Sequence, residues 1–393
     1  MKRILFYTEN FAGPSSKGGT EVATFRIAKA LRESGRCEVY NAFRSKPPQE
    51  YPDVYAHCVQ LPKSDAGFTS SLADFLSRNH IDAVVNMSRF FRHRHILNSV
   101  RKVSPDIRLL FMQHFAPGSE FRKTTWKAGR HLLSLNPFNP LYWLRASLYP
   151  LLKLPRNIRL PKIYRDTYLQ SDKVILLSDK YKEEYAGIGG FTPGDKFESV
   201  PNIFESPVES GPSSLKKEKR VLILSRMDEI QKRLSLALEI WKVIEKDIDL
   251  SDWHLDIVGS GHNADIVKRL IKRLKLKNVT YHGWQDPKPF LERSSILMMT
   301  SSYEGLPLSI LEAQAYGCVP VAFNSFGSLT DIVDNYENGI IVENFGDTED
   351  YVRKLKDIMY DENYRAELSR NSIRNSSRFS PEKIAEKWLK ILT

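Results

Sequence analysis

The sequence predicts an α/β protein of two doubly wound domains, each a parallel sheet covered by helices. Short apolar runs alternate with amphipathic helical runs along the chain of 393 residues. This alternation is typical of buried parallel strands joined by helices. It stops at a stretch rich in Pro, Gly and Ser and then restarts, which indicates a linker between two domains. The chain is long enough for each domain to have its own core.

The first domain is expected over residues 1–200. Its predicted elements are a strand at Lys2–Thr8, a helix at Glu21–Glu33, buried strands at Ala83–Asn86 and Leu109–Met112, and a last strand at Val174–Ser178. A linker is expected over residues 201–219.

The second domain is expected over residues 220–375. Predicted strands lie at Arg220–Ser225, Leu255–Val258, Asn278–Gly283, Ile296–Thr300 and Val319–Ala322, and predicted helices at Leu234–Ile244, Ile266–Leu274 and Leu308–Tyr316. The stretch after Asp347 is predicted to be helical. Residues 376–393 are expected to form a C-terminal helix that packs back on the first domain, with Ser380-Pro381 as its start.

Most of the excess positive charge lies in one segment. The formal net charge is +11, and residues 121–165 contain ten Lys or Arg and no Asp or Glu. Aromatic residues such as Trp126, Tyr142 and Trp143 are interleaved with them. This composition suits an anionic membrane surface or a nucleic-acid backbone. The alternative is a helical insertion that packs on its own domain and leaves its cations in solvent.

The remaining composition indicates a cytoplasmic protein. Lys2 and Arg3 precede an apolar run that is too short for an export signal. No uncharged apolar run is long enough to span a membrane. Three scattered cysteines indicate neither a disulfide framework nor a zinc site. We therefore expect a cytoplasmic location, peripheral on the inner face of the cell membrane if the basic segment binds lipid.

The strongest functional signal is a pair of glutamates, Glu304 and Glu312, with seven residues between them. A turn leads from the predicted strand into the predicted helix, and its residues are Gly305, Leu306, Pro307 and Leu308. The free N–H groups and the dipole of a helix start can hold phosphate. Carboxylates beside it suit the hydroxyls of a sugar or a ribose. Alone, such a pair is more often two solvated glutamates on an amphipathic helix.

This run, continued by Ala313-Gln314-Ala315-Tyr316-Gly317-Cys318-Val319-Pro320-Val321, resembles the E-x7-E region of retaining GT-B glycosyltransferases (group 1, family 4-like) of bacterial cell-envelope synthesis. The resemblance covers most of residues 220–345 and only scattered points before them. It implies two Rossmann-like domains facing each other across a cleft. The second domain would hold a nucleotide-sugar donor and the first the acceptor. Glu304 would then bind the donor sugar and Glu312 the ribose.

Two cations extend the resemblance. Arg226 follows the first strand of the second domain, and Lys232 comes six residues later. In the family such a pair clasps the donor diphosphate, and fixed cations neutralise the charge that develops on this leaving group. Family members usually have Gly after the lysine, where this chain has Arg233. The alternative is two surface cations.

Two shorter signals lie in the first domain. Gly18 and Gly19 precede the first helix, for which Thr20 is a candidate N-cap. In the family this loop faces the cleft near the donor phosphates; the alternative is an ordinary strand-to-helix turn. His114 follows a buried strand, where the family often has a histidine that touches the donor sugar. The family's usual Asp is replaced by Phe115, and a structural histidine is the alternative.

A glycine-rich turn follows the second strand of the second domain. Gly259 and Gly261 fit a dinucleotide fingerprint, but the acid expected at the end of the next strand is missing. NAD is therefore rejected. The resemblance instead implies that this turn lines the nucleotide cleft and that the loop at Trp284 reads the base. Asp247-Ile248-Asp249 imitates a metal-binding D-x-D, but its polar loop favours a solvated role, and no metal is expected.

The function expected is retaining transfer of a sugar from a nucleotide diphosphate sugar, UDP being the commonest, to a saccharide or lipid-linked saccharide. Capsule, lipopolysaccharide or exopolysaccharide assembly is the expected context. No cofactor is expected beyond this donor substrate, and the chain would be a monomer or dimer. A nucleotide-sugar epimerase or hydrolase of the same architecture is the main alternative. A nucleic-acid-binding protein is less favoured, because no zinc, helix-turn-helix or RNP-like signature is present.

Overall fold

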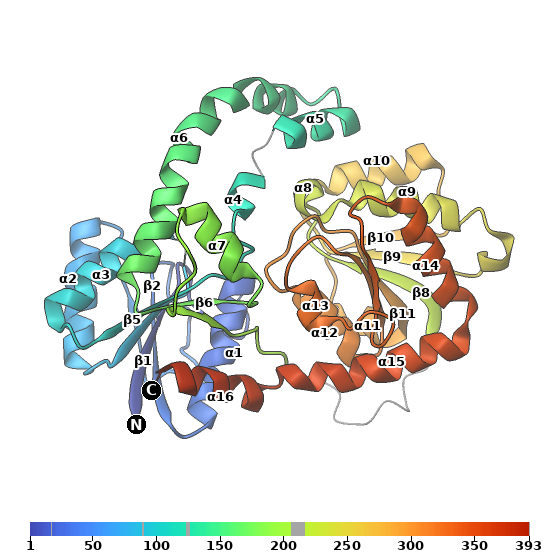
Figure 1. Cartoon of the computed structure of the whole chain (residues 1–393). Helices are drawn as coiled ribbons and strands as arrows, with labels where there is room; N and C mark the ends of the chain where they lie inside the picture. The colour runs from blue at the N-terminus through green and yellow to red at the C-terminus, as the bar shows by residue number, and fades with distance from the viewer. Residues whose placement is uncertain (17, 89, 123–125, 206–216, 393) are drawn as a thin grey trace. The chain divides into compact units, whose positions relative to one another are not determined.

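The computed structural model of the chain contains two compact units (Figure 1). Unit 1 comprises Met1–Gly118, Pro155–Glu205 and Phe379–Thr393, and unit 2 comprises Ser119–Leu154 and Ser206–Arg378. The structure describes every residue except 17, 89, 123–125, 206–216 and 393. At residues 91, 121, 122, 126–128, 145, 146 and 148–158 it describes the backbone but not the side chains. Most of the predicted linker therefore lies outside the described residues.

Unit 1 contains a parallel sheet in the order β3-β2-β1-β4-β5-β6-β7. Its strands are β1 (Lys2–Tyr7), β2 (Cys37–Phe43), β3 (His57–Gln60), β4 (Ala83–Asn86), β5 (Arg108–Met112), β6 (Lys173–Leu176) and β7 (Phe197–Ser199). The predicted last strand is thus not the last. β7 has only three residues, which is too short to give a recognisable apolar run.

Helices cover both faces of this sheet. They are α1 (Gly19–Glu33), α2 (Asp65–Arg78), α3 (His93–Val103), the C-terminal part of α6 (Pro140–Gln170), α7 (Tyr181–Gly189) and α16 (Pro381–Leu392), with the short 3-10 helix η1 (Phe90–Arg92). Leu5 and Tyr7 belong to the same apolar cluster as the buried side chains of α2 and α3. Phe6 points to the other face, where its ring meets the edge of Trp388 in α16. The C-terminal helix therefore packs on unit 1, beside α1 (Figure 1).

Unit 2 repeats the architecture with the sheet order β10-β9-β8-β11-β12-β13, again all parallel. Its strands are β8 (Glu218–Leu224), β9 (His254–Val258), β10 (Val279–Gly283), β11 (Ser294–Met299), β12 (Val319–Phe323) and β13 (Ile340–Val342). Its helices are α4 (Ser119–Arg122), α5 (Trp126–Leu135), the N-terminal part of α6, α8 (Glu229–Lys232), α9 (Leu234–Ile244), α10 (Ala264–Leu274), α11 (Lys288–Arg293), α12 (Leu308–Ala315), α13 (Leu329–Ile332), α14 (Thr348–Tyr360) and α15 (Glu362–Ser376). The 3-10 helix η2 (Ile248–Leu250) lies between α9 and β9, and η3 (Ser377–Phe379) leads from unit 2 into unit 1.

The core of unit 2 forms because its strands are apolar on both faces. Alternate strand residues such as Val221 and Ile223 pack with the apolar sides of α9, α10 and α14. Helices α12 and α15 contact each other as a second layer, and Figure 1 shows them on the opposite side of the sheet from α9 and α14. Trp241 of α9 and Trp253 before β9 are fully buried in this core.

We call residues 119–154 the arm; they include α4, α5 and the beginning of α6 (Figure 1). The sequence pattern assigns the whole basic segment 121–165 to the first domain, whereas by its contacts the arm groups with unit 2. The physical reason is apolar burial, since Leu132 and Tyr142 are buried in the core cluster of unit 2. Within the described part of the chain, no helix is both long and apolar enough to cross a membrane.

Candidate functional site

The candidate site of unit 2 lies where its strand order reverses. Chain order runs outward in one direction from β8 to β9 and in the other from β11 to β12. Open α/β sheets bind ligands outside the carboxyl ends of the strands at such a switch point. The loop after β8 carries Arg226 and the loop after β11 carries Glu304, so the topology brings these two segments together.

An ion pair joins the two loops. The Lys232 Nζ lies 2.6 Å from Oε1 of Glu304, and both side chains are largely buried. The other carboxylate oxygen accepts a hydrogen bond from Nε2 of Gln231 at 3.1 Å. The pattern places Glu304 at an open loop tip, whereas both of its carboxylate oxygens are bonded inside unit 2. A cation and an anion are therefore held side by side at the switch point.

Gln231 also connects Arg226 to this pair. Its Oε1 accepts a hydrogen bond from Nη2 of Arg226 at 3.3 Å. Its backbone N–H donates to Oδ1 of Asp228, which caps α8. Arg226 itself is exposed. The guanidinium is thus available to a ligand while its position is guided by the buried Gln231.

The glycine-rich turn after β9 packs directly against the Arg226 loop. A Cβ on Gly261 would lie 2.7 Å from the backbone oxygen and 2.8 Å from the backbone nitrogen of Met227. A Cβ on Gly259, whose φ is +133°, would lie 1.9 Å from the carbonyl oxygen of Ser225. These glycines are therefore required for close approach of two protein loops, besides any role in lining a nucleotide site.

Helix α12 begins beside the ion pair. Pro307 is its N-cap and Leu308 its first residue, which is the predicted start of this helix. Leu306 and Pro307 are buried, and Gly305 and Leu308 are partly exposed. Glu312 lies in the second turn of the helix and is also partly exposed. The helix start and both glutamates of the E-x7-E run thus belong to the same edge of unit 2.

Trp284 follows β10 and is 77% exposed. The strand end before it is anchored by the buried Asp256, whose Oδ1 lies 2.7 Å from Nε2 of His282. Burial alone would raise the pKa of Asp256, but the bonds to His282 and Arg220 hold its pKa below the usual range. The indole of Trp284 is therefore exposed at the end of a strand that the Asp256–His282 contact holds in place.

Unit 1 carries the remaining predicted residues. Gly18 is the N-cap of α1, so the helix begins before Thr20, which is not the cap that the pattern indicates. A Cβ on Gly18 would lie 1.9 Å from Oε2 of Glu21, while one on Gly19 would meet open space. The turn is closed by Nδ2 of Asn10, which donates to Oε1 of Glu21 at 2.8 Å.

His114 follows β5 in unit 1. Burial lowers its pKa to about 4, so the ring is neutral near pH 7. Its Nε2 is buried and has no hydrogen-bond partner among the described residues. A buried ring nitrogen without a partner is uncommon in a folded protein. His114 therefore keeps a free hydrogen-bonding position.

The Asp247-Ile248-Asp249 loop has partners within the protein. The carboxylate of Asp247 accepts hydrogen bonds from Lys356 and Tyr360. No group of three or more His, Cys, Asp or Glu among the described residues could hold a metal ion. Cys37, Cys58 and Cys318 are free thiols.

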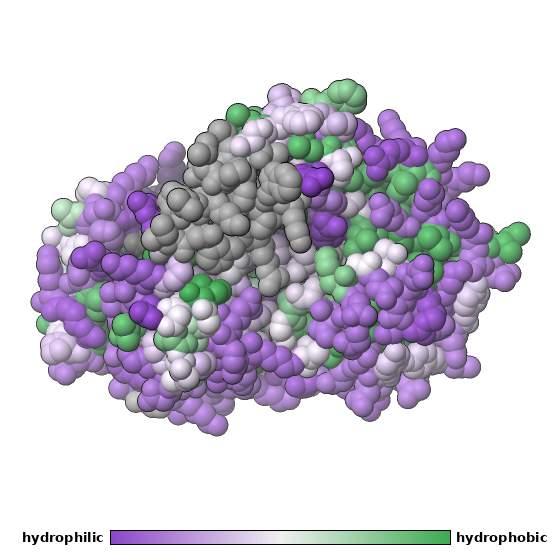
Figure 2. Space-filling model, turned by 45° about the horizontal axis from the view of Figure 1, so that its top comes forward, coloured by the Kyte–Doolittle hydropathy of each residue, from purple (hydrophilic) through white to green (hydrophobic). Residues whose placement is uncertain are grey.

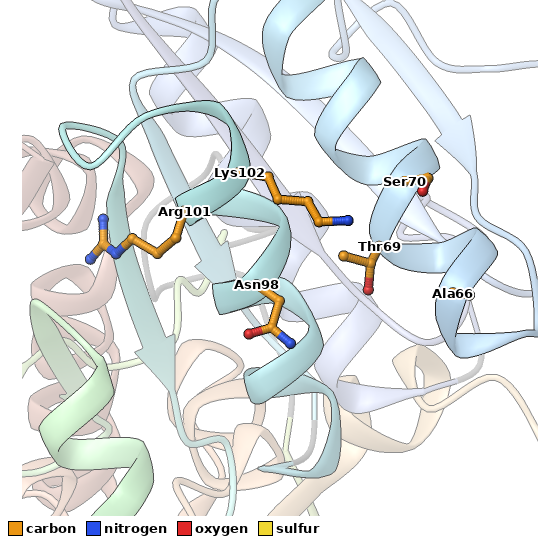
Figure 3. A pocket seen from close by; sticks show the side chains of 6 residues that line it. All are labelled: Ala66, Thr69, Ser70, Asn98, Arg101 and Lys102. Atoms are coloured by element: carbon orange, nitrogen blue, oxygen red, sulfur yellow. The ribbon is translucent and has the colours of Figure 1, made fainter.

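A shallow hollow of about 500 Å³ lies between α2 and α3. Figure 3 shows Lys102 of α3 directed towards Thr69 of α2, while Arg101 points away. The hollow contains none of the predicted site residues.

Comparison with known proteins gives the family of the second half of the chain. Residues 207–375 match the family of "Glycosyl transferases group 1". The chain carries a glycosyl transferases group 1 domain. This domain contains Arg226, Lys232, Glu304 and Glu312, so the ion pair and the helix start lie inside the matched region.

Relatives of known sequence match over part of the chain. An "Uncharacterized glycosyltransferase" of Haemophilus influenzae is 33% identical over 163 residues, which cover 41% of this chain and 45% of that protein. A "Poly(glycerol-phosphate) alpha-glucosyltransferase" of Bacillus subtilis is 25% identical over 231 residues, 57% of this chain and 33% of its own length. The chain thus spans less than half the length of these relatives.

A solved structure matches over the whole chain. It is a mutant of TarM from Staphylococcus aureus, crystallised with fondaparinux, alpha-GlcNAc-glycerol and UDP. The two structures superpose with a TM-score of 0.73 at 14% sequence identity, and the match covers 100% of both chains. At this identity the likeness shows the fold, which is that of the GT-B glycosyltransferases. The predicted fold class is confirmed.

Three residues that contact the site loops were missed by sequence reasoning. Gln231 bridges Arg226 and Glu304, while Glu229 and Asn263 are buried in the loops on either side. Their partners are distant in sequence: His131 contacts Glu229, and Tyr142 contacts Asn263. No local pattern marks these three residues, because their roles depend on these distant partners.

Proposed function

We propose that this protein is a retaining glycosyltransferase that moves a sugar from a nucleotide diphosphate sugar, most simply a UDP-sugar, to a saccharide acceptor. The observation that carries the proposal is the Lys232–Glu304 pair, 2.6 Å apart, at the switch point of the group 1 domain. A donor sugar has hydroxyls for a carboxylate and a diphosphate for cations, so this pair suits both of its ends. The glycosyltransferase relatives and the UDP in the TarM complex support this choice of substrate.

The reaction replaces the bond between the anomeric carbon and the diphosphate oxygen by a bond to an acceptor hydroxyl. Arg226 and Lys232 stabilise the negative charge that grows on the departing diphosphate. The N–H groups at the start of α12 add a partial positive charge. Glu304 holds the sugar hydroxyls and Glu312 those of the ribose.

In this proposal the acceptor proton passes to an oxygen of the departing phosphate, on the same face of the sugar. That path retains the anomeric configuration without a protein nucleophile. Burial lowers the pKa of His114 to about 4, so near pH 7 the ring carries no imidazolium proton to donate as a general acid. We assign it a hydrogen bond to the donor sugar near the reacting carbon, supported by its unpartnered buried Nε2.

We assign the acceptor to unit 1, and its class to saccharides or lipid-linked saccharides of envelope polysaccharides. The named relative that acts on poly(glycerol-phosphate) supports an envelope context. The arm supports a membrane location: four of the 14 exposed large hydrophobic side chains among the described residues are Phe138, Leu141, Trp143 and Leu144. The described surface in Figure 2 is otherwise mainly hydrophilic, with hydrophobic residues in small groups.

Calorimetric titration with UDP, GDP, ADP and NAD tests the donor assignment. We expect saturable binding of one nucleoside diphosphate by the wild type, and binding about tenfold weaker in Glu312→Ala because a charged hydrogen bond is lost. Glu239→Ala on α9, which removes an exposed glutamate of the same unit, is the matched control and should bind like the wild type. Absence of binding to any of the four would refute the donor site.

A turnover assay separates transfer from other uses of the same donor. The purified protein is incubated with the sugar donor of the nucleotide that binds, with and without a lipid-linked saccharide acceptor. Release of nucleotide that depends on the acceptor supports transfer, whereas release at the same rate without it indicates a hydrolase. An epimerised sugar still attached to its nucleotide would indicate an epimerase.

A further inference from the structure

Two side chains of the arm touch the loops that carry the proposed diphosphate site. His131 in α5 places Nε2 2.8 Å from Oε1 of Glu229. Tyr142 at the beginning of α6 accepts a hydrogen bond from Nδ2 of Asn263 at 3.0 Å. Glu229 is in α8 and Asn263 immediately precedes α10. The arm therefore contacts both loops that flank Arg226.

These contacts form one continuous chain of hydrogen bonds. Between its two ends, the backbone N–H of Glu229 donates to Oδ1 of Asn263 at 3.0 Å. Asn263 in turn donates its backbone N–H to the carbonyl oxygen of Met227 at 3.0 Å. The chain begins on His131 and ends on Tyr142, and it passes through both loops. Any displacement of the arm is thereby carried to the segment between Arg226 and Lys232.

Glu229 makes this link energetically important. Its side chain is 1% exposed, and its carboxylate also accepts hydrogen bonds from the backbone N–H and the hydroxyl of Ser235. A buried carboxylate is strongly destabilised when one of its donors is removed. Since a carboxylate only accepts hydrogen bonds, Nε2 of His131 is the donor of this pair. His131 thus supplies one of the bonds that keep Glu229 in place.

The position of Glu229 determines that of Lys232. The two residues lie in the same single-turn helix α8, and the carbonyl oxygen of Glu229 accepts the N–H of Arg233 directly after Lys232. The Lys232 backbone is further held by the hydroxyl of Thr300, which donates to its carbonyl oxygen at 2.9 Å. A shift of α8 would therefore change the 2.6 Å contact between Lys232 and Glu304.

We infer that the arm is a positioning element for the diphosphate-binding loop, with His131 and Tyr142 as positioning residues that act through Glu229 and Asn263. This inference rests on the proposed donor site and adds a role for a segment whose composition indicates only surface binding. Apolar packing of Leu132 and Tyr142 in the core of unit 2 supplies the rigid base that such a role requires.

Paired variants of His131 test the inference. We expect His131→Ala to weaken UDP binding and to raise the KM for the sugar donor by about five- to tenfold, with a smaller change in kcat. His131→Gln keeps a side-chain N–H near Glu229 and should restore both values to within about twofold. Tyr142→Phe, which removes only a hydroxyl, should weaken UDP binding by about two- to fivefold.

His254→Ala is the matched control. This histidine also belongs to unit 2 and makes a side-chain hydrogen bond, to Thr280 at 2.8 Å, but it lies at the beginning of β9, away from the loops at the strand ends. It should leave UDP affinity unchanged. Melting temperatures of all variants are measured in parallel, so that unfolding is recognised.

Each outcome decides the inference. If His131→Ala binds UDP as the wild type does, or if His131→Gln fails to restore binding in a folded protein, the arm has no positioning role. If the wild type itself binds none of the tested nucleotides, the proposed function fails and this inference fails with it. Loss of affinity in both His131→Ala and Tyr142→Phe, with rescue by His131→Gln, establishes the positioning role.

Discussion

In the proposed mechanism, the residue pair Glu304 and Lys232 serves two parts of one ligand. In this structure the ammonium group is bonded to the carboxylate, and little of either side chain is exposed. A bound diphosphate would contact Lys232 together with Glu304. A bound sugar would need the Glu304 carboxylate to accept hydrogen bonds from its hydroxyls. In the proposed mechanism, the ion pair keeps Lys232 neutralised until a donor binds.

The variant Glu304→Gln separates these two tasks. The amide keeps the shape of the side chain but removes its charge, so Lys232 becomes more available to phosphate. We expect UDP to bind at least as tightly as in the wild type, while turnover of the sugar donor falls about 100-fold. Calorimetry with UDP and a nucleotide-release assay measure the two effects. A parallel fall of both would contradict the assignment of Glu304 to the sugar.

Gly261→Ala tests the packing of the two site loops. The new methyl group would meet backbone atoms of Met227 at less than 3 Å, and backbone atoms cannot move aside as a flexible side chain can. We expect a loss of about 1–3 kcal/mol in stability, measured by denaturant unfolding, together with weaker UDP binding. Gly19→Ala, where the space is open, is the control and should not destabilise the protein.

At the scale of single elements, patterns with strong periodicity were predicted accurately. β4 and α9 have the predicted bounds, because a run of buried apolar residues or a regular amphipathic face leaves few alternatives. β7 and β13 have three residues each and gave no pattern. The start of α1 at Gly19 was missed because Thr20 is a good N-cap by residue type alone.

Helix α3 carries a pH-dependent contact of its own. His93 is 1% exposed; Nδ1 lies 3.3 Å from Nδ2 of Asn86 in β4, and Nε2 lies 3.0 Å from Oγ of Ser171 after α6. Burial lowers its pKa to about 4. Because the unfolded chain binds this proton near pH 6.5 and the folded chain does not, stability is fully present above pH 6.5 and falls as the pH drops towards 4.

The variant His93→Gln should therefore flatten the pH dependence. Between pH 7 and pH 4.5 we expect the wild type to lose on the order of 2–3 kcal/mol more stability than the variant. Urea unfolding at both pH values measures the difference. Burial also lowers the pKa of His114, which contributes equally to the pH dependence of the wild type and of the variant. Only the difference in stability change between the two proteins therefore reports on His93. Equal slopes would show that His93 is protonated without cost.

At the scale of the whole molecule, we propose two roles for the arm. Its inner side chains His131 and Tyr142 contact the site loops of unit 2, and its exposed large hydrophobic side chains lie at residues 138–144. Of the ten basic residues in 121–165, six have side chains outside the described set. An exposed apolar group on a strongly basic segment favours an anionic lipid surface.

A vesicle-binding assay tests this role with the full chain. We expect binding to vesicles of phosphatidylglycerol mixed with phosphatidylcholine, and little binding to phosphatidylcholine alone. Phe138→Ser with Leu141→Ser should weaken binding by about tenfold or more, since two apolar side chains no longer enter the lipid. Ile248→Ser, which replaces an 82% exposed residue outside the arm, is the control. Equal binding of all three proteins would argue against an apolar contact by the arm.

The sequence by itself determined the two doubly wound sheets and the positions along the chain of the residues that we propose for the donor site. Apolar runs specify buried strands through local burial, and Arg226, Lys232, Glu304 and Glu312 lie at strand ends and a helix start that chain order alone locates. Only the tertiary structure decided that Glu304 pairs with Lys232, that Gln231 joins Arg226 to them, and that the arm packs on unit 2. The contacts of Glu304 with Lys232 and Gln231, and that of Tyr142 with Asn263, connect residues about 70 to 120 positions apart. Such pairing depends on how whole elements pack, which no local pattern encodes.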